Sequence, residues 1–194
     1  MKEKTAKVVR IITVPPVLAC ILFVVLAARR PDLFLHRADL AMALICLCLI
    51  PTLAYPCAPL FPKLGKDRRQ VQRKLAFIFS FSGYLILDLY GFLSRAGGPL
   101  QMVFNTYMLS VLLLILFNKG LKMRASGHAC SATSPLVFII YFVGTGWILP
   151  CLLIGALIVW SSLTLKRHTV LDLSLGCLVC LVSFGLCRLL LMAA

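Results

Sequence analysis

The chain has 194 residues, of which 20 are Lys or Arg and only 6 are Asp or Glu, so its formal net charge is +14. Hydrophobic residues make up 61% of the chain, and its mean hydropathy is +1.01. No soluble domain of this size needs so much apolar surface, and the composition therefore excludes a water-soluble globular protein. The Lys and Arg stand in short loops between apolar runs, where they set topology and attract anionic lipid headgroups. This placement disfavours nucleic acid as a partner.

Seven hydrophobic segments are predicted, and the whole chain, residues 1–194, is expected to form a single integral membrane domain. Backbone polar groups must be satisfied inside a bilayer, and the apolar runs are continuous rather than alternating, so helices are favoured over a barrel. The predicted fold class is all-α, a polytopic membrane bundle of about six or seven transmembrane helices. The segments are residues 10–28, 38–61, 75–94, 99–118, 127–144, 147–164 and 169–191.

The segment boundaries carry their own signals. The first segment resembles a signal peptide, but it is long for one and ends in Arg29 and Arg30, so an uncleaved anchor helix is expected. The second holds four prolines between residues 51 and 62 and should be kinked or broken near its end. Residues 95–99 form a strong loop signal, and Gly144, Gly146 and Pro150 require a very tight turn.

Loop charges predict the orientation of the bundle. With the N-terminus in the cytoplasm, fifteen Lys and Arg fall on the cytoplasmic side and five on the other, a clear positive-inside bias. The fifteen are Lys2, Lys4, Lys7, Arg10, Lys63, Lys66, Arg68, Arg69, Arg73, Lys74, Lys119, Lys122, Arg124, Lys166 and Arg167. The five are Arg29, Arg30, Arg37, Arg95 and Arg188.

The number of cysteines, nine, suggests a disulfide framework, but their positions in the sequence argue against one. Eight lie in apolar runs, and most are expected to be small, buried, reduced hydrophobes. Cys177 and Cys180 form a CxxC pair, but it lies in an apolar helix without a histidine or a soluble βαβ context, which disfavours a redox role.

The first chemical motif is His168 with Asp172, at the start of the last predicted helix. A spacing of four on a helix places the carboxylate one turn along the same face, where it can fix the imidazole tautomer. The other ring nitrogen is then free to act as a nucleophile or base. A carboxylate inside an apolar segment is costly and usually functional. The alternative is an interfacial histidine beside Lys166 and Arg167, with Asp172 only capping the helix.

The second motif is His128, which follows Ser126 and Gly127 at the start of the fifth segment. Ser126 is a good N-cap, Gly127 allows a ligand to approach the backbone, and free N–H groups at a helix start favour anions. The nearby cations that can neutralise phosphoryl oxygens are Lys119, Lys122 and Arg124. The alternative is a basic loop that acts only as a topology signal.

Two further features concern packing. Asp88, in the middle of the third segment, needs a partner on the next helix such as Asn105 or Tyr107, or else faces a polar cavity, and a structural role is favoured for it. A stripe of small residues on the last helix is expected to pack against a neighbouring helix, with a groove for a lipid tail as the alternative. The stripe, which begins at Asp172, continues through Gly176, Cys180, Ser183 and Cys187.

Together the two histidine motifs resemble the signature of the type 2 phosphatidic acid phosphatase superfamily, the acid-phosphatase-like membrane lipid phosphatases. That family carries a Lys followed by Arg-Pro, then Pro-Ser-Gly-His, then Ser-Arg with a His six residues after the Arg and an Asp four beyond. Residues 125–128 match the second element apart from its Pro, and Ser161, His168 and Asp172 match the third. The resemblance covers about residues 117–176 and marks residues 117–191 as a phosphatase-like core.

The chain also departs from the family pattern in the first and third elements, and in this it resembles a divergent, small bacterial-type member. Ser162 stands where the family has its Arg. Phe117 stands seven residues before Arg124, where the family has its Lys, and no Pro follows that Arg. The cations available as replacements are Lys119, Lys122, Lys166 and Arg167.

The resemblance implies hydrolysis of a lipid phosphate or diphosphate, polyprenyl or glycerolipid, through a phosphohistidine. His168 would attack phosphorus, Asp172 would orient it, and His128 would protonate the leaving oxygen and then activate water. The substrate-binding residues would be Lys119, Lys122, Arg124, Ser126, Gly127 and Arg167. No metal or cofactor is expected, and the partners are the lipid substrate and the membrane.

Two other functions remain open from the sequence. The chain could be a non-catalytic phospholipid or anion-binding or transport protein on the same scaffold, because Ser162 removes a phosphate ligand of the family. It could also be a structural helical bundle whose basic loops only set topology.

Overall fold

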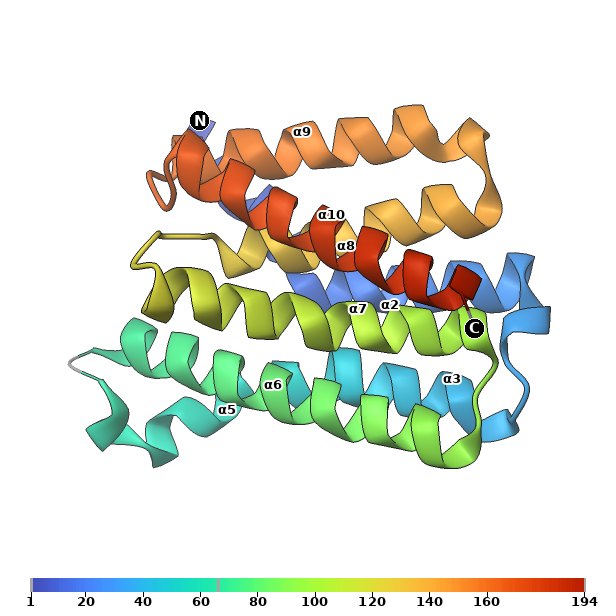
Figure 1. The fold of residues 1–194 in the computed structure, drawn as a ribbon. Helices are drawn as coiled ribbons and strands as arrows, with labels where there is room; N and C mark the ends of the chain where they lie inside the picture. The colour runs from blue at the N-terminus through green and yellow to red at the C-terminus, as the bar shows by residue number, and fades with distance from the viewer. Residues whose placement is uncertain (1, 66, 194) are drawn as a thin grey trace.

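The computed structural model describes residues 2–65 and 67–193, and within these ranges the chain forms helices and no β-strand. The long helices run side by side in one bundle (Figure 1), which confirms the all-α class. They are α1 (Lys2–Ile12), α2 (Pro15–Arg29), α6 (Arg68–Ser94), α7 (Gly98–Ile115), α8 (Gly127–Val143), α9 (Ile148–Thr164) and α10 (Val170–Ala193). The shorter elements are η1 (Pro31–Leu33), α3 (Arg37–Leu44), η2 (Ile45–Leu49), α4 (Ile50–Thr52), α5 (Ala54–Cys57), η3 (Ala58–Leu60), η4 (Pro62–Leu64), η5 (Leu116–Gly120) and η6 (Thr145–Trp147).

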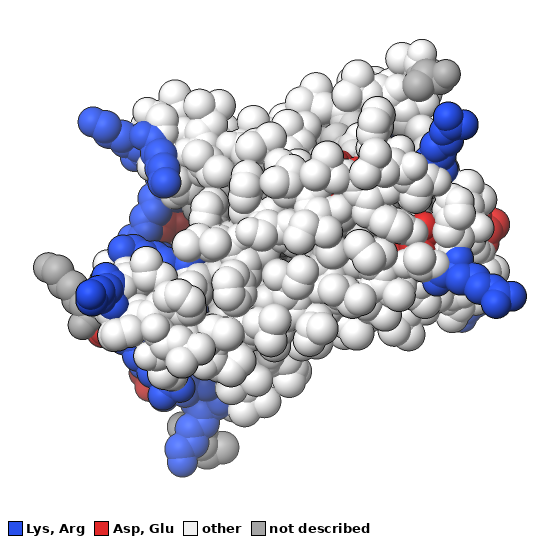
Figure 2. Space-filling model, turned by 90° about the horizontal axis from the view of Figure 1, so that it is seen from below, with Lys and Arg blue, Asp and Glu red and all other residues white. Residues whose placement is uncertain are grey.

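The described helices are those of a multi-pass membrane bundle. Five stretches are long and apolar enough to cross a membrane, and a sixth crossing results if α1 and α2, which meet at 51°, form one bent span. Helix α8 is also apolar, but with 17 residues, or about 25 Å, it is shorter than these five stretches. Lys and Arg gather at the two ends of the bundle and leave a largely white belt between them (Figure 2). Lys66, one of the residues that set the predicted orientation, lies outside the described residues.

Prolines and glycines determine where the helices break. The predicted first segment is not one straight helix, because Pro15 and Pro16 follow an extended Val14 and separate α1 from α2. The proline-rich end of the second segment breaks into the short pieces α4, α5, η3 and η4, as expected. Arg95 ends α6 in a left-handed conformation with φ of 52°, and Gly144 turns the chain with φ of 119°.

The carboxylate of Asp88, inside the bundle, finds partners on the neighbouring helix. The amide of Gln101 on α7 lies 3.3 Å from the carboxylate of Asp88, and Asn105, with its amide turned to donate, lies 2.6 Å from the same oxygen. Asp88 therefore has a partner on the next helix, the first of the two alternatives that the sequence left open. The small-residue stripe on α10 is buried, and α10 packs against α7 and α8, so the stripe is a packing surface. All nine cysteines are free.

Candidate active site

Both histidine motifs lie at the same end of the bundle and line the same cavity. His128 stands in the first turn of α8, and His168 stands in the turn between α9 and α10. The two side chains border a cavity of about 1050 Å³ and are close enough to interact electrostatically. Two imidazoles that are 40 positions apart in the chain therefore face one space.

His168 contacts Asp172, although not along a regular helix. Helix α10 begins at Val170, so His168 lies two residues before it, and the predicted stacking of the two side chains on one helical turn is wrong. The turn still brings Nδ1 of His168 to 3.6 Å from Oδ2 of Asp172, with 13% and 8% of the side chains exposed. This separation is longer than a hydrogen bond, and among the described residues Nδ1 has no hydrogen-bond partner.

The Asp172 carboxylate also caps α10, so the two interpretations from the sequence hold together. Its Oδ2 accepts a hydrogen bond from the Thr169 N–H at 3.1 Å, and the Asp172 N–H donates to the Thr169 hydroxyl at 3.1 Å. This reciprocal pair is a capping box. The same Oδ2 lies 3.6 Å from Nε of Arg124. One carboxylate oxygen therefore faces a helix N-terminus, a guanidinium and an imidazole.

Backbone and side-chain hydrogen bonds hold the His128 loop against α10. The Ser126 N–H donates to the Asp172 carbonyl at 2.9 Å, and the Ser126 hydroxyl accepts from the Ala129 N–H at 3.2 Å, which confirms the predicted N-cap. Asn118 closes the basic loop, since its amide donates to the Ala125 carbonyl at 3.1 Å and accepts from the Ala125 N–H at 3.2 Å. The two motifs are therefore fixed to each other directly.

Gly176 allows α8 and α10 to approach at the site. A Cβ at this position would collide with the Ser126 carbonyl oxygen and lie 3.0 Å from the Ala129 Cβ. We expect Gly176→Ala to push the His128 loop from α10 and to lower the melting temperature in detergent by about 2 to 10 °C, an overpacking effect. Gly185→Ala is the matched control on the same helix, because nothing lies within 4 Å of its Cβ position. Equal melting temperatures for the two variants would contradict this packing.

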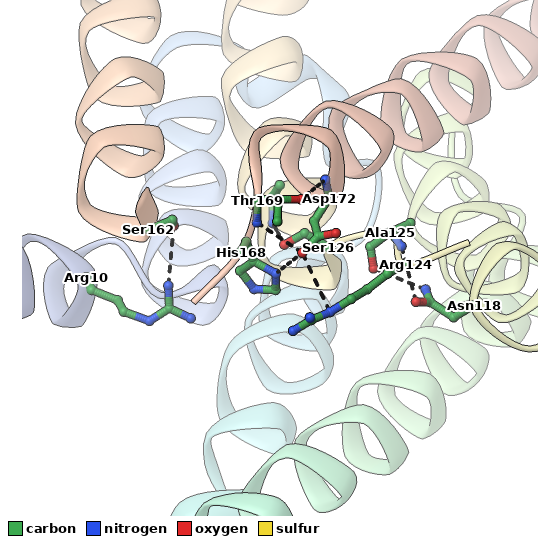
Figure 3. Close-up of polar contacts among 10 residues, drawn as sticks. Arg10, Asn118, Arg124, Ala125, Ser126, Ser162, His168, Thr169 and Asp172 are labelled. Atoms are coloured by element: carbon green, nitrogen blue, oxygen red, sulfur yellow. Dashed lines mark hydrogen bonds and ion pairs between the residues drawn. The ribbon is translucent and has the colours of Figure 1, made fainter. Parts of the chain in front are cut away.

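Figure 3 shows His168 between the guanidinium groups of Arg10 and Arg124. Arg10 comes from α1 and Arg124 from the loop before α8, and both interact electrostatically with His168. The basic residues that line the cavity are Arg10, Arg69, Arg73, Lys74, Lys119 and Arg167. The phosphate that the sequence predicts would therefore meet cations from four parts of the chain.

The predicted binding residues are not all at the cavity. Lys119, Gly127 and Arg167 line it, while Ser126 is buried behind it and Arg124 contacts Asp172. Lys122 does not line the cavity and is exposed in a left-handed turn with φ of 52°. The structure adds residues that the site prediction did not include, because no local spacing marks them: Arg10, Arg69, Arg73, Lys74 and Asn118.

Burial and positive charge favour the neutral form of His168. Burial is the largest influence that lowers the pKa of His168 below 6.5, and Arg10 adds to it, while the Asp172 carboxylate opposes the shift. The imidazole is therefore uncharged at neutral pH, as a nucleophile must be. Among the described residues, no group of three or more His, Cys, Asp and Glu is arranged as metal ligands.

Comparisons with models of protein families, with curated proteins and with solved structures gave no match to this chain. No relative supplies a function for it. The chemistry of the cavity is what supports one.

Proposed function

We propose that this protein is an integral membrane hydrolase that removes phosphate from a lipid phosphate or diphosphate through a phosphohistidine. It would be a divergent, bacterial-type member of the type 2 phosphatidic acid phosphatase superfamily. The observation that carries this proposal is the meeting of His128 and His168 at one cavity with a cationic rim. A paired nucleophile and acid among fixed cations suits a phosphoryl transfer that passes through a covalent intermediate.

The shape of the cavity fits an amphiphile. It extends along η5 and α7 from Lys119, at the charged end of the bundle, to Tyr107, a distance of about three helical turns. Between these ends its walls include apolar side chains such as Phe77, Leu114 and Ile115. A phosphate bound among the cations could therefore keep its tail against apolar walls, which favours a polyprenyl or glycerolipid substrate over a soluble one.

The proposed reaction has two steps. In the first, Nε2 of His168 attacks phosphorus while Nδ1 faces Asp172, and the bond from phosphorus to the lipid oxygen breaks. His128, which must enter this step as the imidazolium, gives its proton to that oxygen. In the second, His128 takes a proton from water, the resulting hydroxide attacks the phosphohistidine, and the P–N bond breaks to release inorganic phosphate. The cations and the N–H groups near Gly127 stabilise the charge on the equatorial oxygens.

The proposed location is the cell membrane of a bacterium, with the site on the cytoplasmic face. The end of the bundle that holds the cavity also carries the larger share of Lys and Arg, and positive loops stay in the cytoplasm.

Purified protein in detergent tests the function directly. With a chelator present, it should release inorganic phosphate from a polyprenyl phosphate or diphosphate or from phosphatidic acid, and much more slowly from glycerol phosphate, which has no tail. Stabilisation by orthovanadate without any release of phosphate would instead identify a non-catalytic anion-binding protein. Neither release nor stabilisation would contradict both functions.

The pH dependence of His168 reactivity tests its surroundings. Only the neutral imidazole reacts with diethyl pyrocarbonate, and because burial lowers the pKa of His168, half of its rings are neutral at a pH below 6.5. The rate of modification at His168, followed by mass spectrometry, should therefore have its midpoint below pH 6.5, and a midpoint above that value would contradict the geometry. The groups that interact with the ring are Arg10, Arg73, Arg124, His128 and Asp172.

A further inference from the structure

Arg10 joins the first helix of the protein to the candidate active site. It lies near the end of α1, which packs against α9. Its Nη1 donates to the hydroxyl of Ser162 on α9 at 3.3 Å, across 152 positions of sequence. Ser162 is completely buried, so this contact holds the guanidinium at the wall of the cavity that contains both histidines.

The described residues supply no ion-pair partner for the guanidinium of Arg10. Among them, only one of the five N–H donors of this guanidinium has an acceptor. A partly buried guanidinium without a partner is unfavourable. Arg10 interacts electrostatically with both His128 and His168. An anion that pairs with Arg10 would therefore lie within reach of both imidazoles.

We infer that Arg10 is a phosphate-binding residue, which holds an oxygen of the substrate phosphate. It takes the place of the Arg that the family pattern has where this chain has Ser162. This inference rests on the proposed function for its substrate. Arg10 forms a charge-assisted hydrogen bond to the phosphate from the N-terminal helix, on the side of His168 opposite Arg124 (Figure 3). Helix α1 is then part of the site and more than a membrane anchor.

Three variants of α1 separate this role from general charge. Arg10→Gln should lower kcat/KM for the lipid phosphate by about 100-fold, the size of effect seen when one transition-state donor is removed, and should weaken inhibition by orthovanadate. Arg10→Lys keeps the charge without the fork and should fall between Arg10→Gln and the unchanged protein. Lys4→Gln is the matched control, because it removes the same charge from an exposed position of the same helix.

A swap between helices tests the position of the guanidinium. Ser162→Arg alone should give no gain in turnover, because a second guanidinium would crowd the first. In the Arg10→Gln background, Ser162→Arg should recover at least about tenfold of the lost kcat/KM, since it supplies the donor from α9. A gain from Ser162→Arg alone, or no recovery in the double variant, would overturn the inference.

The outcomes for Arg10 and for the proposed function remain distinct. If the unchanged protein hydrolyses lipid phosphate and Arg10→Gln is as active as Lys4→Gln, the inference about Arg10 fails and the function stands. If nothing is hydrolysed, the function fails, and the rise in melting temperature with orthovanadate decides on Arg10: its loss in Arg10→Gln supports phosphate binding, and its retention refutes it. If Arg10→Gln elutes as an aggregate, Arg10→Lys and the double variant decide.

Discussion

His168→Ala should reduce the rate of phosphate release by about 10⁴- to 10⁶-fold, the loss that follows removal of a nucleophile or its base from a catalytic pair. The reason is that His168, whose Nδ1 lies 3.6 Å from the Asp172 carboxylate, is the nucleophile of the proposed covalent step. Release measured under single-turnover conditions with excess enzyme would report the chemical step directly.

His36→Asn is the control for this prediction. His36 is half-exposed at the N-terminus of α3, and asparagine keeps the capping function there, so activity should be unchanged. A His168→Ala variant that elutes as a folded protein and retains more than about one hundredth of the activity would remove His168 from the covalent step.

Asp172→Asn should lower the rate by about 10²- to 10⁴-fold with little change in the melting temperature. The amide oxygen can still accept from the Thr169 N–H, which now bonds to the carboxylate at 3.1 Å. It carries no charge to orient His168 or to stabilise the imidazolium that forms during the reaction. The measurement is the rate of phosphate release at several pH values, together with thermal melting in detergent.

Thr169→Ala isolates the capping role of the same pair. It removes the hydroxyl that accepts from the Asp172 N–H and should cost about 1 kcal/mol of stability, while the carboxylate keeps its charge and activity falls little. If Thr169→Ala and Asp172→Asn lose activity equally, Asp172 acts only by capping α10. The prediction that it orients His168 would then be wrong.

The helical plan of the molecule could be predicted because apolar runs and breakers are local signals. The loop at residues 95–99 and the turn at Gly144 appear where Gly and Pro end the hydrophobic runs. The break between α1 and α2 was missed, although Pro15 and Pro16 stand there, because the apolar run continues through them. Composition measures hydrophobicity, and it does not measure whether a helix bends.

The site could be predicted in part. Residues within the two motifs lie at or beside the cavity, because short loops between spans leave them few positions. Spacing did not predict the geometry of His168 and Asp172, since α10 begins only at Val170. Arg10 and Arg73 approach from helices distant in sequence. In the sequence, their charges indicate only the topology of the bundle. Contacts of that kind depend on how the helices pack.

The identity of the phosphorylated residue tests the proposed phosphohistidine directly. The protein would be mixed with excess lipid phosphate labelled with ³²P, quenched in base within the first turnover, digested, and its peptides sequenced by mass spectrometry. The proposed reaction predicts label that is stable to base and labile to acid on His168, with more of it trapped in His128→Ala, which cannot activate water. Label on another residue, or release of phosphate without any labelled protein, would contradict it.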